Sequence, residues 1–235
     1  MKNHHIPLNE RIIFALDVAD PKQAAALVEQ LDTQIKFFKV GLQLFFAGGW
    51  PVVDHIVGRG NKVMLDLKLY DIPATVTLAI KQFADRGVAL TTVHGYTPVV
   101  EAALAAGTDI NILAVTVLTS MGEEHLKELH FQGTVDQLVE QRSAAVLACG
   151  SHGIVCSARE AATLRRKLGQ EFIMVTPGIR PAGSAANDQQ RIATPGKAIK
   201  DGADYLVVGR PIRDAENQQQ VITAMQQEID TALSL

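Results

Sequence analysis

The sequence has little cysteine, no long apolar run and no basic cluster, and each absence excludes a class of protein. Its two cysteines, Cys149 and Cys156, are too few for a disulfide framework or a cysteine-based zinc site, so we expect both to be reduced. No apolar stretch reaches the roughly 18–20 residues that a membrane helix needs. The first residues also lack the apolar centre of a secretory signal. We therefore expect a cytoplasmic protein without a membrane partner.

The charge balance argues against nucleic acid as a partner. The formal net charge is −3 and no lysine- or arginine-rich run occurs, whereas a nucleic-acid-binding surface requires a basic patch. An anionic ligand must then be bound by a few local donors. The histidines show no metal-ligand spacing, so the sequence predicts no metal site.

Short apolar, β-branched runs alternate with segments that have the apolar spacing of helices. This alternation predicts an α/β protein, a single (β/α)8 TIM barrel domain over residues 1–235. A doubly wound open sheet is the alternative, but the Gly-x-Gly-x-x-Gly fingerprint after the first strand is absent. The expected strands are residues 12–17, 37–40, 63–68, 90–94, 110–118, 153–156, 172–176 and 205–209, and the expected helices include 22–31, 74–86, 158–168 and 211–233.

The segment Asp-Leu-Lys-Leu-Tyr-Asp-Ile-Pro, residues 66–73, is the most informative part of the chain. Side chains alternate along a strand, so Asp66 and Lys68 should point to the same side. Burying two charges is costly unless they are paired. A lysine beside carboxylates is held in its ammonium form, which makes it a poor nucleophile and a good proton donor.

Other charged residues stand at the ends of neighbouring strands, where barrels have their active sites. Asp17 ends the first expected strand and Lys39 lies at the end of the second, so both should converge with Asp66 and Lys68 in an alternating array. The alternative is that each charge pairs with a neighbour only to offset its own burial. Asp20, which precedes a proline, is the better cap for the next helix, and this leaves Asp17 available for a ligand.

Two glycine- and arginine-containing loops predict a phosphate site on the other side of the barrel. Gly178 and Arg180 follow the seventh expected strand, and Gly209 and Arg210 follow the eighth. Barrels often bind phosphate with these two loops, where glycine permits close approach and arginine offers forked donors. The alternative is a pair of turn glycines with solvated arginines.

Three further side chains have less specific signals. His94 ends the fourth expected strand, where a histidine can be an acid or base but more often packs in a hydrogen-bonded network. Thr119, after the fifth strand, can bond a ligand or turn the chain. Asp71 lies near a helix start marked by a proline, so it can cap that helix.

These motifs together resemble those of the orotidine 5′-phosphate decarboxylase family, in its bacterial type, over nearly the whole chain. The fold of that family is a (β/α)8 barrel. The resemblance implies decarboxylation of orotidine 5′-phosphate to uridine 5′-phosphate (UMP) without a cofactor. The matching segments are FALDV (14–18), FKVG (38–41), DLKLYDIPATV (66–76), VTVLTS (115–120), TPGIRP (176–181) and VVGRP (207–211).

The resemblance also implies a role for each matching residue. Asp17 and Lys39 would bind the ribose hydroxyls, with Lys39 also in the charged network. Asp66 would lie against the substrate carboxylate, and Lys68 would deliver the proton. The other implied contacts are Thr119 to the pyrimidine and Arg180, Gln189, Gly209 and Arg210 to the phosphate, with the loop of residues 177–193 as a lid.

A second subunit is implied as well. Asp71, Ile72 and Thr75 would reach into the active site of a partner, which gives a homodimer with shared active sites. The nearest rivals are a magnesium-dependent keto-sugar-phosphate decarboxylase and a hexulose-phosphate synthase; the Asp-Ile-Pro continuation and Arg180 favour the nucleotide enzyme. A Schiff-base aldolase would need a neutral Lys68, and a non-catalytic nucleotide-binding barrel would bind without turnover.

Overall fold

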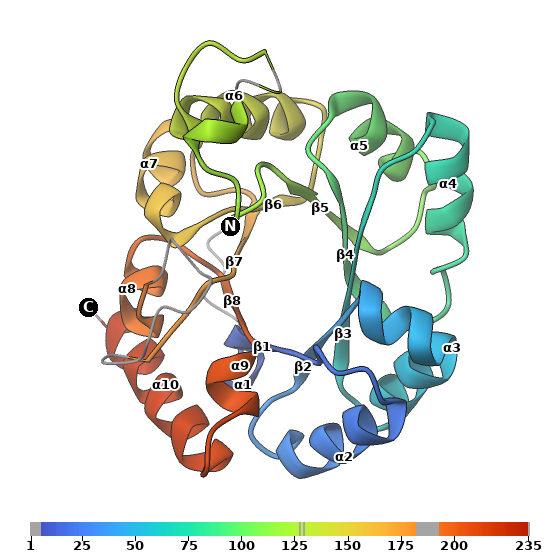
Figure 1. Cartoon of the computed structure of the whole chain (residues 1–235), viewed down its shortest axis with the longest axis vertical. Coiled ribbons are helices and arrows are strands. Elements are labelled where there is room, and N and C mark those ends of the chain that lie inside the picture. The colour runs from blue at the N-terminus through green and yellow to red at the C-terminus, as the bar shows by residue number, and fades with distance from the viewer. Residues whose placement is uncertain (1–5, 127, 129, 182–192, 235) are drawn as a thin grey trace.

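Eight parallel strands form a closed barrel in a computed structural model that describes residues 6–126, 128, 130–181 and 193–234. Each strand pairs with the next along the chain, and β8 pairs with β1 to close the ring (Figure 1). The strands are β1 (Ile12–Ala15), β2 (Phe37–Gly41), β3 (Lys62–Leu69), β4 (Val88–His94), β5 (Asn111–Val115), β6 (Gly153–Val155), β7 (Ile173–Thr176) and β8 (Tyr205–Val208).

Helices surround the barrel and connect its strands (Figure 1). The helix over Pro21–Leu31 begins at a clear helix-start signal: Asp20 accepts a hydrogen bond from the Lys22 N–H at 2.9 Å, with Pro21 as the first helical residue. The α-helices are α1 (Leu8–Arg11), α2 (Pro21–Leu31), α3 (Leu42–Gly58), α4 (Pro73–Lys81), α5 (Thr97–Leu104), α6 (Val135–Ala148), α7 (Ala158–Leu168), α8 (Pro195–Lys200), α9 (Arg210–Arg213) and α10 (Gln218–Leu233), and η1 (Glu123–Leu126) is a 3₁₀ helix.

The predicted barrel is confirmed, and two strand ends are corrected. Strand β1 ends at Ala15, so Asp17 lies in the following loop. Strand β5 ends at Val115, and the expected residues 116–118 continue as loop. Val117 is nevertheless only 5% exposed. Val117 is therefore apolar because this part of the loop packs into the core. Composition alone does not distinguish a buried loop residue from a buried strand residue.

The last expected helix is also corrected, because residues 211–233 do not form one helix. The four-residue helix α9 ends at Arg213, and α10 begins at Gln218. Asn217 caps α10 by accepting a hydrogen bond from the Gln220 N–H at 3.0 Å. A side chain that accepts a hydrogen bond from the backbone N–H three residues later favours a new helix start over a continuous helix. The expected helix of residues 74–86 likewise ends earlier, at Lys81.

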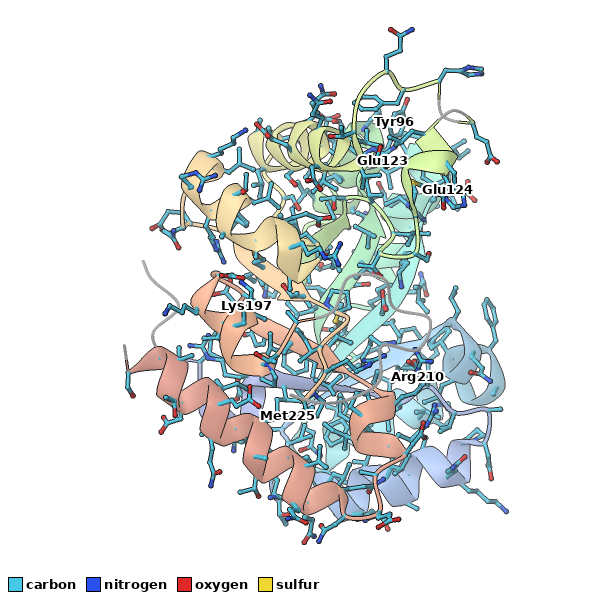
Figure 2. The ribbon with its side chains drawn as sticks, turned by 60° about the vertical axis from the view of Figure 1, so that its left-hand side comes forward. Tyr96, Glu123, Glu124, Lys197, Arg210 and Met225 are labelled. Carbon is cyan, nitrogen blue, oxygen red and sulfur yellow. The ribbon has the colours of Figure 1, made fainter. Side chains whose placement is uncertain are left out.

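Two apolar cores explain why the strands are nearly continuous apolar runs. One core fills the inside of the barrel, and the other lies between the strands and the helices; Met225 of α10 belongs to this outer core (Figure 2). Strands buried on both faces have little need of alternating polar residues. Charged residues on such strands are therefore exceptions. The inner core consists of Ile13, Phe37, Met64, Leu90, Leu113, Val115, Val155 and Val175.

Two smaller findings bear on the exclusions drawn from composition. Cys149 and Cys156 are free thiols, and burial raises the pKa of the Cys156 thiol. Over the described part of the chain, none of the helices combines the length and apolar character that crossing a membrane requires.

Candidate active site

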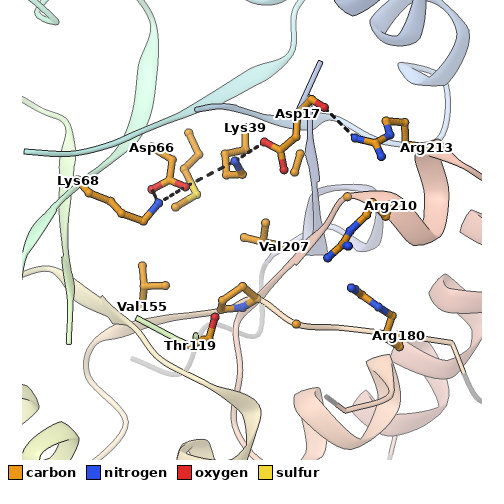
Figure 3. A pocket seen from close by; sticks show the side chains of 15 residues that line it. Asp17, Lys39, Asp66, Lys68, Thr119, Val155, Arg180, Val207, Arg210 and Arg213 are labelled. Carbon is orange, nitrogen blue, oxygen red and sulfur yellow. Dashed lines mark hydrogen bonds and ion pairs between the residues drawn. The ribbon is translucent and has the colours of Figure 1, made fainter. Parts of the chain in front are cut away.

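A cavity of about 440 Å³ opens at the carboxyl ends of the barrel strands (Figure 3). Five cationic side chains and two carboxylates line it, so the cavity suits an anionic ligand. The lining residues are Ala15, Asp17, Lys39, Met64, Asp66, Lys68, Thr119, Val155, Pro177, Gly178, Arg180, Val207, Gly209, Arg210 and Arg213.

Four of the lining side chains form a row of alternating charge along one wall (Figure 3). The Lys39 Nζ lies 2.9 Å from the Asp17 Oδ1 and 3.6 Å from the Asp66 Oδ2. The Lys68 Nζ lies 2.9 Å from both carboxylate oxygens of Asp66. The Asp66 carboxylate therefore lies between two ammonium groups. One belongs to Lys39 of β2 and the other to Lys68 of β3.

Burial and pairing act against each other in this row. Burial alone would raise the pKa of Asp66, but the ammonium groups of Lys39 and Lys68 outweigh it and the pKa is lowered. Burial alone would lower the pKa of Lys39, but Asp66 and Asp17 outweigh it and the pKa is raised. Both groups are thus held in their charged forms, although their side chains are only 11% and 9% exposed.

Strand register explains how the row is assembled. Gly41 of β2 pairs with Asp66 of β3, two residues after Lys39. A Cβ at Gly41 would lie 3.1 Å from the Lys39 Nζ, which is tighter than an ordinary contact. Glycine at this position therefore leaves the space in which the Lys39 ammonium group meets Asp66.

Asp17 lies at the exposed end of the row, with 53% of its side chain accessible. Arg213, from the last residue of α9, donates a hydrogen bond to the Asp17 carbonyl oxygen at 2.8 Å and pairs with Asp214 at 2.6 Å. The sequence reasoning missed Arg213. Its signal was the position three residues after Arg210, about one helical turn away, which places both side chains on one side of a short helix.

Two arginines lie across the cavity from Asp66 and Lys68 (Figure 3). Arg180 is buried, and its Nη1 donates to the Ile179 carbonyl at 2.9 Å. Arg210 is the first residue of α9 (Figure 2). Gly178 has φ of +78°, a conformation that residues with a side chain rarely adopt, and it turns the chain after β7 toward Arg180. The two arginines can therefore present forked donors to one anion.

Of the two less specific candidates Thr119 and His94, only Thr119 lines the cavity. His94 lies outside it, with its ring at 5.5 Å from the Tyr70 ring, and burial together with Lys68 and Arg142 lowers its pKa. This placement agrees with the packing interpretation of His94.

Four predicted site residues are not part of the cavity as described. Asp71, Ile72 and Thr75 are exposed at the start of α4. Asp71 does not cap that helix, whose N-cap is Ile72; its Oδ1 accepts a hydrogen bond from the Ile72 N–H at 2.7 Å. Gln189 and most of the expected lid, residues 182–192, lie outside the described residues.

The chemistry open to this cavity follows from its two halves. A lysine whose ammonium group is held by a carboxylate, as Lys68 is by Asp66 at 2.9 Å, can donate a proton to a reacting atom, while the arginines can hold an anionic group away from the reaction. Within the ranges that the structure describes, no group of three or more His, Cys, Asp or Glu side chains is placed to hold a metal ion. The cavity therefore combines a proton donor with an anion-binding side.

Comparison with known proteins gives a consistent result. The sequence model of the "Orotidine 5′-phosphate decarboxylase / HUMPS family" matches residues 10–225. The chain is 49% identical over 225 residues to an orotidine 5′-phosphate decarboxylase of Afipia carboxidovorans, covering 95% of this chain and 96% of the relative. It is 46% identical over 229 residues to one of Rhodopseudomonas palustris, covering 97% of both.

The fold gives the same answer. The crystal structure of orotidine 5′-phosphate decarboxylase from Lactobacillus acidophilus is similar with a TM-score of 0.83 at 32% sequence identity, covering 94% of this chain and 99% of that one. The family model spans almost the entire barrel, including the charged row and both arginine loops. The chain therefore belongs to the orotidine 5′-phosphate decarboxylase / HUMPS family.

Proposed function

We propose that this protein decarboxylates orotidine 5′-phosphate to UMP, the step that completes a pyrimidine nucleotide. The observation that carries the proposal is the row Asp17–Lys39–Asp66–Lys68, which faces two arginines across one cavity. The relatives at 42–49% identity that are named orotidine 5′-phosphate decarboxylase support it. The magnesium-dependent sugar-phosphate enzymes considered from the sequence are not favoured.

The cavity matches this substrate in charge and size. Orotidine 5′-phosphate carries a phosphate and a carboxylate, and the lining has more cationic than anionic side chains. A volume of about 440 Å³ falls within the roughly 300–1,000 Å³ typical of small-molecule sites. We place the phosphate on Arg180 and Arg210, because the forked guanidinium group of arginine can bind two oxygens of one phosphate. Gly209 and Gln189 complete the proposed phosphate site, as the family resemblance implies.

This placement fixes the orientation of the remaining groups. With the phosphate at the arginines, the ribose lies beside Asp17 and Lys39, whose charged groups can bond its hydroxyls. The pyrimidine then reaches Thr119 on one side and the Asp66–Lys68 pair on the other. The reacting carbon is thus brought to the ammonium group of Lys68.

The proposed reaction needs no cofactor. The bond between carbon 6 of the pyrimidine and its carboxylate carbon breaks, carbon dioxide leaves, and the electron pair stays on carbon 6. The ammonium group of Lys68 stabilises that negative charge and then transfers a proton to it, and water reprotonates the lysine. Lys39 and Asp66 act through the charge of the row, which holds Lys68 in place at 2.9 Å from Asp66.

Asp66 has a second role in this scheme. Its carboxylate lies where the substrate carboxylate must approach Lys68, so the bound substrate meets negative charge that disappears as neutral carbon dioxide leaves. An interaction that becomes less unfavourable in the transition state accelerates the chemical step. Contacts to the distant phosphate provide the binding free energy that holds the substrate there.

We further propose a homodimer in which Asp71, Ile72 and Thr75 complete the active site of the partner subunit. The support is a set of exposed apolar side chains in and around α4 and before α5: Tyr70, Ile72, Leu78 and Tyr96 are 65%, 66%, 62% and 56% exposed. Tyr70 and Tyr96 also stack edge to face with ring centroids 6.1 Å apart. Exposed apolar groups of this kind mark protein interfaces.

The cytoplasmic location stays a prediction, which fractionation of expressing cells would test.

The decisive experiment follows the ultraviolet absorbance of orotidine 5′-phosphate with purified protein, with and without EDTA. We expect conversion to UMP that EDTA does not affect, and a loss of many orders of magnitude in the Lys68→Ala variant. Lys197→Ala is the matched control, because Lys197 pairs with Asp201 on the surface, away from the cavity. Near-normal turnover by Lys68→Ala, or no turnover by folded wild-type protein, would contradict the proposal.

A further inference from the structure

An irregularity in the barrel wall includes Lys68. Leu65 of β3 pairs with Thr91 of β4, and the next pair is Leu69 with Val93. Three residues of β3 therefore lie opposite one residue of β4, Thr92. Such a bulge interrupts the ladder and redirects side chains, and bulges recur beside active sites.

Lys68 has a strained backbone within this bulge. Its φ is +48°, in the left-handed region that residues with a Cβ enter only at an energetic cost. A strained conformation of this kind persists only where the surrounding structure holds it. The hydrogen-bond ladder between β3 and β4 is interrupted at Lys68, and the left-handed backbone conformation of this residue is intrinsically unfavourable. Some other contact must therefore hold Lys68 in this conformation.

The hydroxyl group of Thr92 makes two contacts in the bulge. It accepts a hydrogen bond from the Lys68 N–H at 3.0 Å and donates one to the Asp66 Oδ1 at 2.8 Å. The direction is fixed, because an ionised carboxylate only accepts and a backbone N–H only donates. Thr92 is fully buried, and a β-branched side chain has few rotamers to choose from.

We propose that Thr92 is a positioning residue for the reaction. Its hydroxyl holds the backbone of Lys68 in the bulge and at the same time orients the carboxylate of Asp66, so one group sets the relative position of the proton donor and its partner. The inference rests on the proposed function, in which the Lys68 ammonium must meet carbon 6. Small errors in such positioning reduce turnover strongly.

The neighbouring threonine provides a matched control. Thr91 is also fully buried, and its hydroxyl donates to the Leu65 carbonyl at 2.9 Å, whereas the hydrogen bonds to Asp66 and Lys68 come from Thr92. Thr91→Val and Thr92→Val therefore remove the same group from adjacent positions in the same strand. A merely structural role for Thr92 predicts the same effect from both.

The experiment measures kcat, KM and unfolding for Thr92→Val, Thr92→Ser and Thr91→Val. We expect Thr92→Val to lower kcat about 10- to 100-fold, the effect of losing a hydrogen bond to a charged group, with KM changed less than about threefold. Thr92→Ser keeps the hydroxyl and should recover most of kcat. Thr91→Val should lose a similar amount of stability and keep wild-type kcat.

Several results would overturn the inference: unchanged kcat in Thr92→Val, an equal kcat loss in Thr91→Val, or no recovery in Thr92→Ser. A crystal structure of Thr92→Val tests the same point without turnover. We expect Lys68 to leave the left-handed region and its 2.9 Å contact with Asp66 to be lost, and retention of both would contradict the positioning role. If wild-type protein fails to convert orotidine 5′-phosphate, the proposed function fails, and the crystal structure still decides the role of Thr92.

Discussion

Replacing Asp66 with asparagine tests whether the alternating row stabilises the fold. The substitution keeps the shape of the side chain and removes the charge that faces Lys68 at 2.9 Å and Lys39 at 3.6 Å. Breaking a buried ion pair costs about 3–5 kcal/mol, because a charge is left without compensation. Here Lys39 keeps its contact with Asp17 at 2.9 Å, and the Lys68 side chain is 31% exposed.

The expected loss is therefore below that range, about 2–3 kcal/mol in the free energy of unfolding at pH 7. For a chain of this length that corresponds to a fall of roughly 5–10 °C in Tm. Urea unfolding at fixed protein concentration, followed by the fluorescence of Trp50, would measure it. Asp54→Asn is the control: Asp54 and Arg86 form an exposed pair at 3.2 Å, for which we expect a change within about 0.5 kcal/mol.

The pH dependence of this difference follows from the pKa of Asp66, which is lowered below its ordinary value of 3.8. A depressed carboxyl pKa contributes stability that is present above the ordinary value and is lost as the pH falls through the lower, folded value. On acidification the wild-type protein should thus lose the stabilisation that the charged Asp66 carboxylate provides, which Asp66→Asn lacks at every pH. The unfolding free energies of the two proteins should therefore converge below about pH 4. Equal stability at pH 7, or a gap that is undiminished at pH 3, would refute this reasoning.

Three further predictions concern the phosphate side, the barrel wall and the dimer. Arg210→Ala should raise KM for orotidine 5′-phosphate by about tenfold or more, because a charge-assisted contact is lost; an unchanged KM in steady-state kinetics would argue against phosphate binding there. Gly153→Ala should cost about 3 kcal/mol in urea unfolding, since its Cβ would clash with the Ile173 carbonyl oxygen of the paired strand, and near-wild-type stability would contradict the packing. Ile72→Asp should shift a dimer to monomer in light scattering while Leu233→Asp on α10 does not, and a dimer that persists would remove the proposed interface.

Much of the fold could be predicted from local pattern. Strands that are buried on both faces read as short apolar runs, and their regular alternation with helical segments predicted the closed barrel before any contact was known. Strand and helix ends were less accurate, as at Asp17 and in the division of the last helix into α9 and α10. Helix caps and the burial of loop residues decide where these elements end. Both depend on contacts in the folded chain, which a local pattern does not contain.

Charge at a strand end did not by itself separate functional from structural residues. Asp204 and Arg165 form a buried ion pair at 2.7 Å, and Asp204 also accepts the Met174 N–H at 2.8 Å. Because Asp204 directly precedes β8, this pair lies at the amino end of the strands, opposite the cavity. Only the direction of each strand in the closed barrel assigns one charged cluster to the site and the other to stability.

The sequence alone determined the strand alternation, the charges at the strand ends and the two arginine loops, because each depends on residues close together along the chain. The tertiary structure alone decided that Asp66 meets both lysines, that Arg213 contacts Asp17, and that Thr92 faces a bulge containing Lys68. These contacts depend on the register between strands and on closure of the barrel. Register and closure are set by packing between residues that are distant in sequence, which no short-range periodicity encodes.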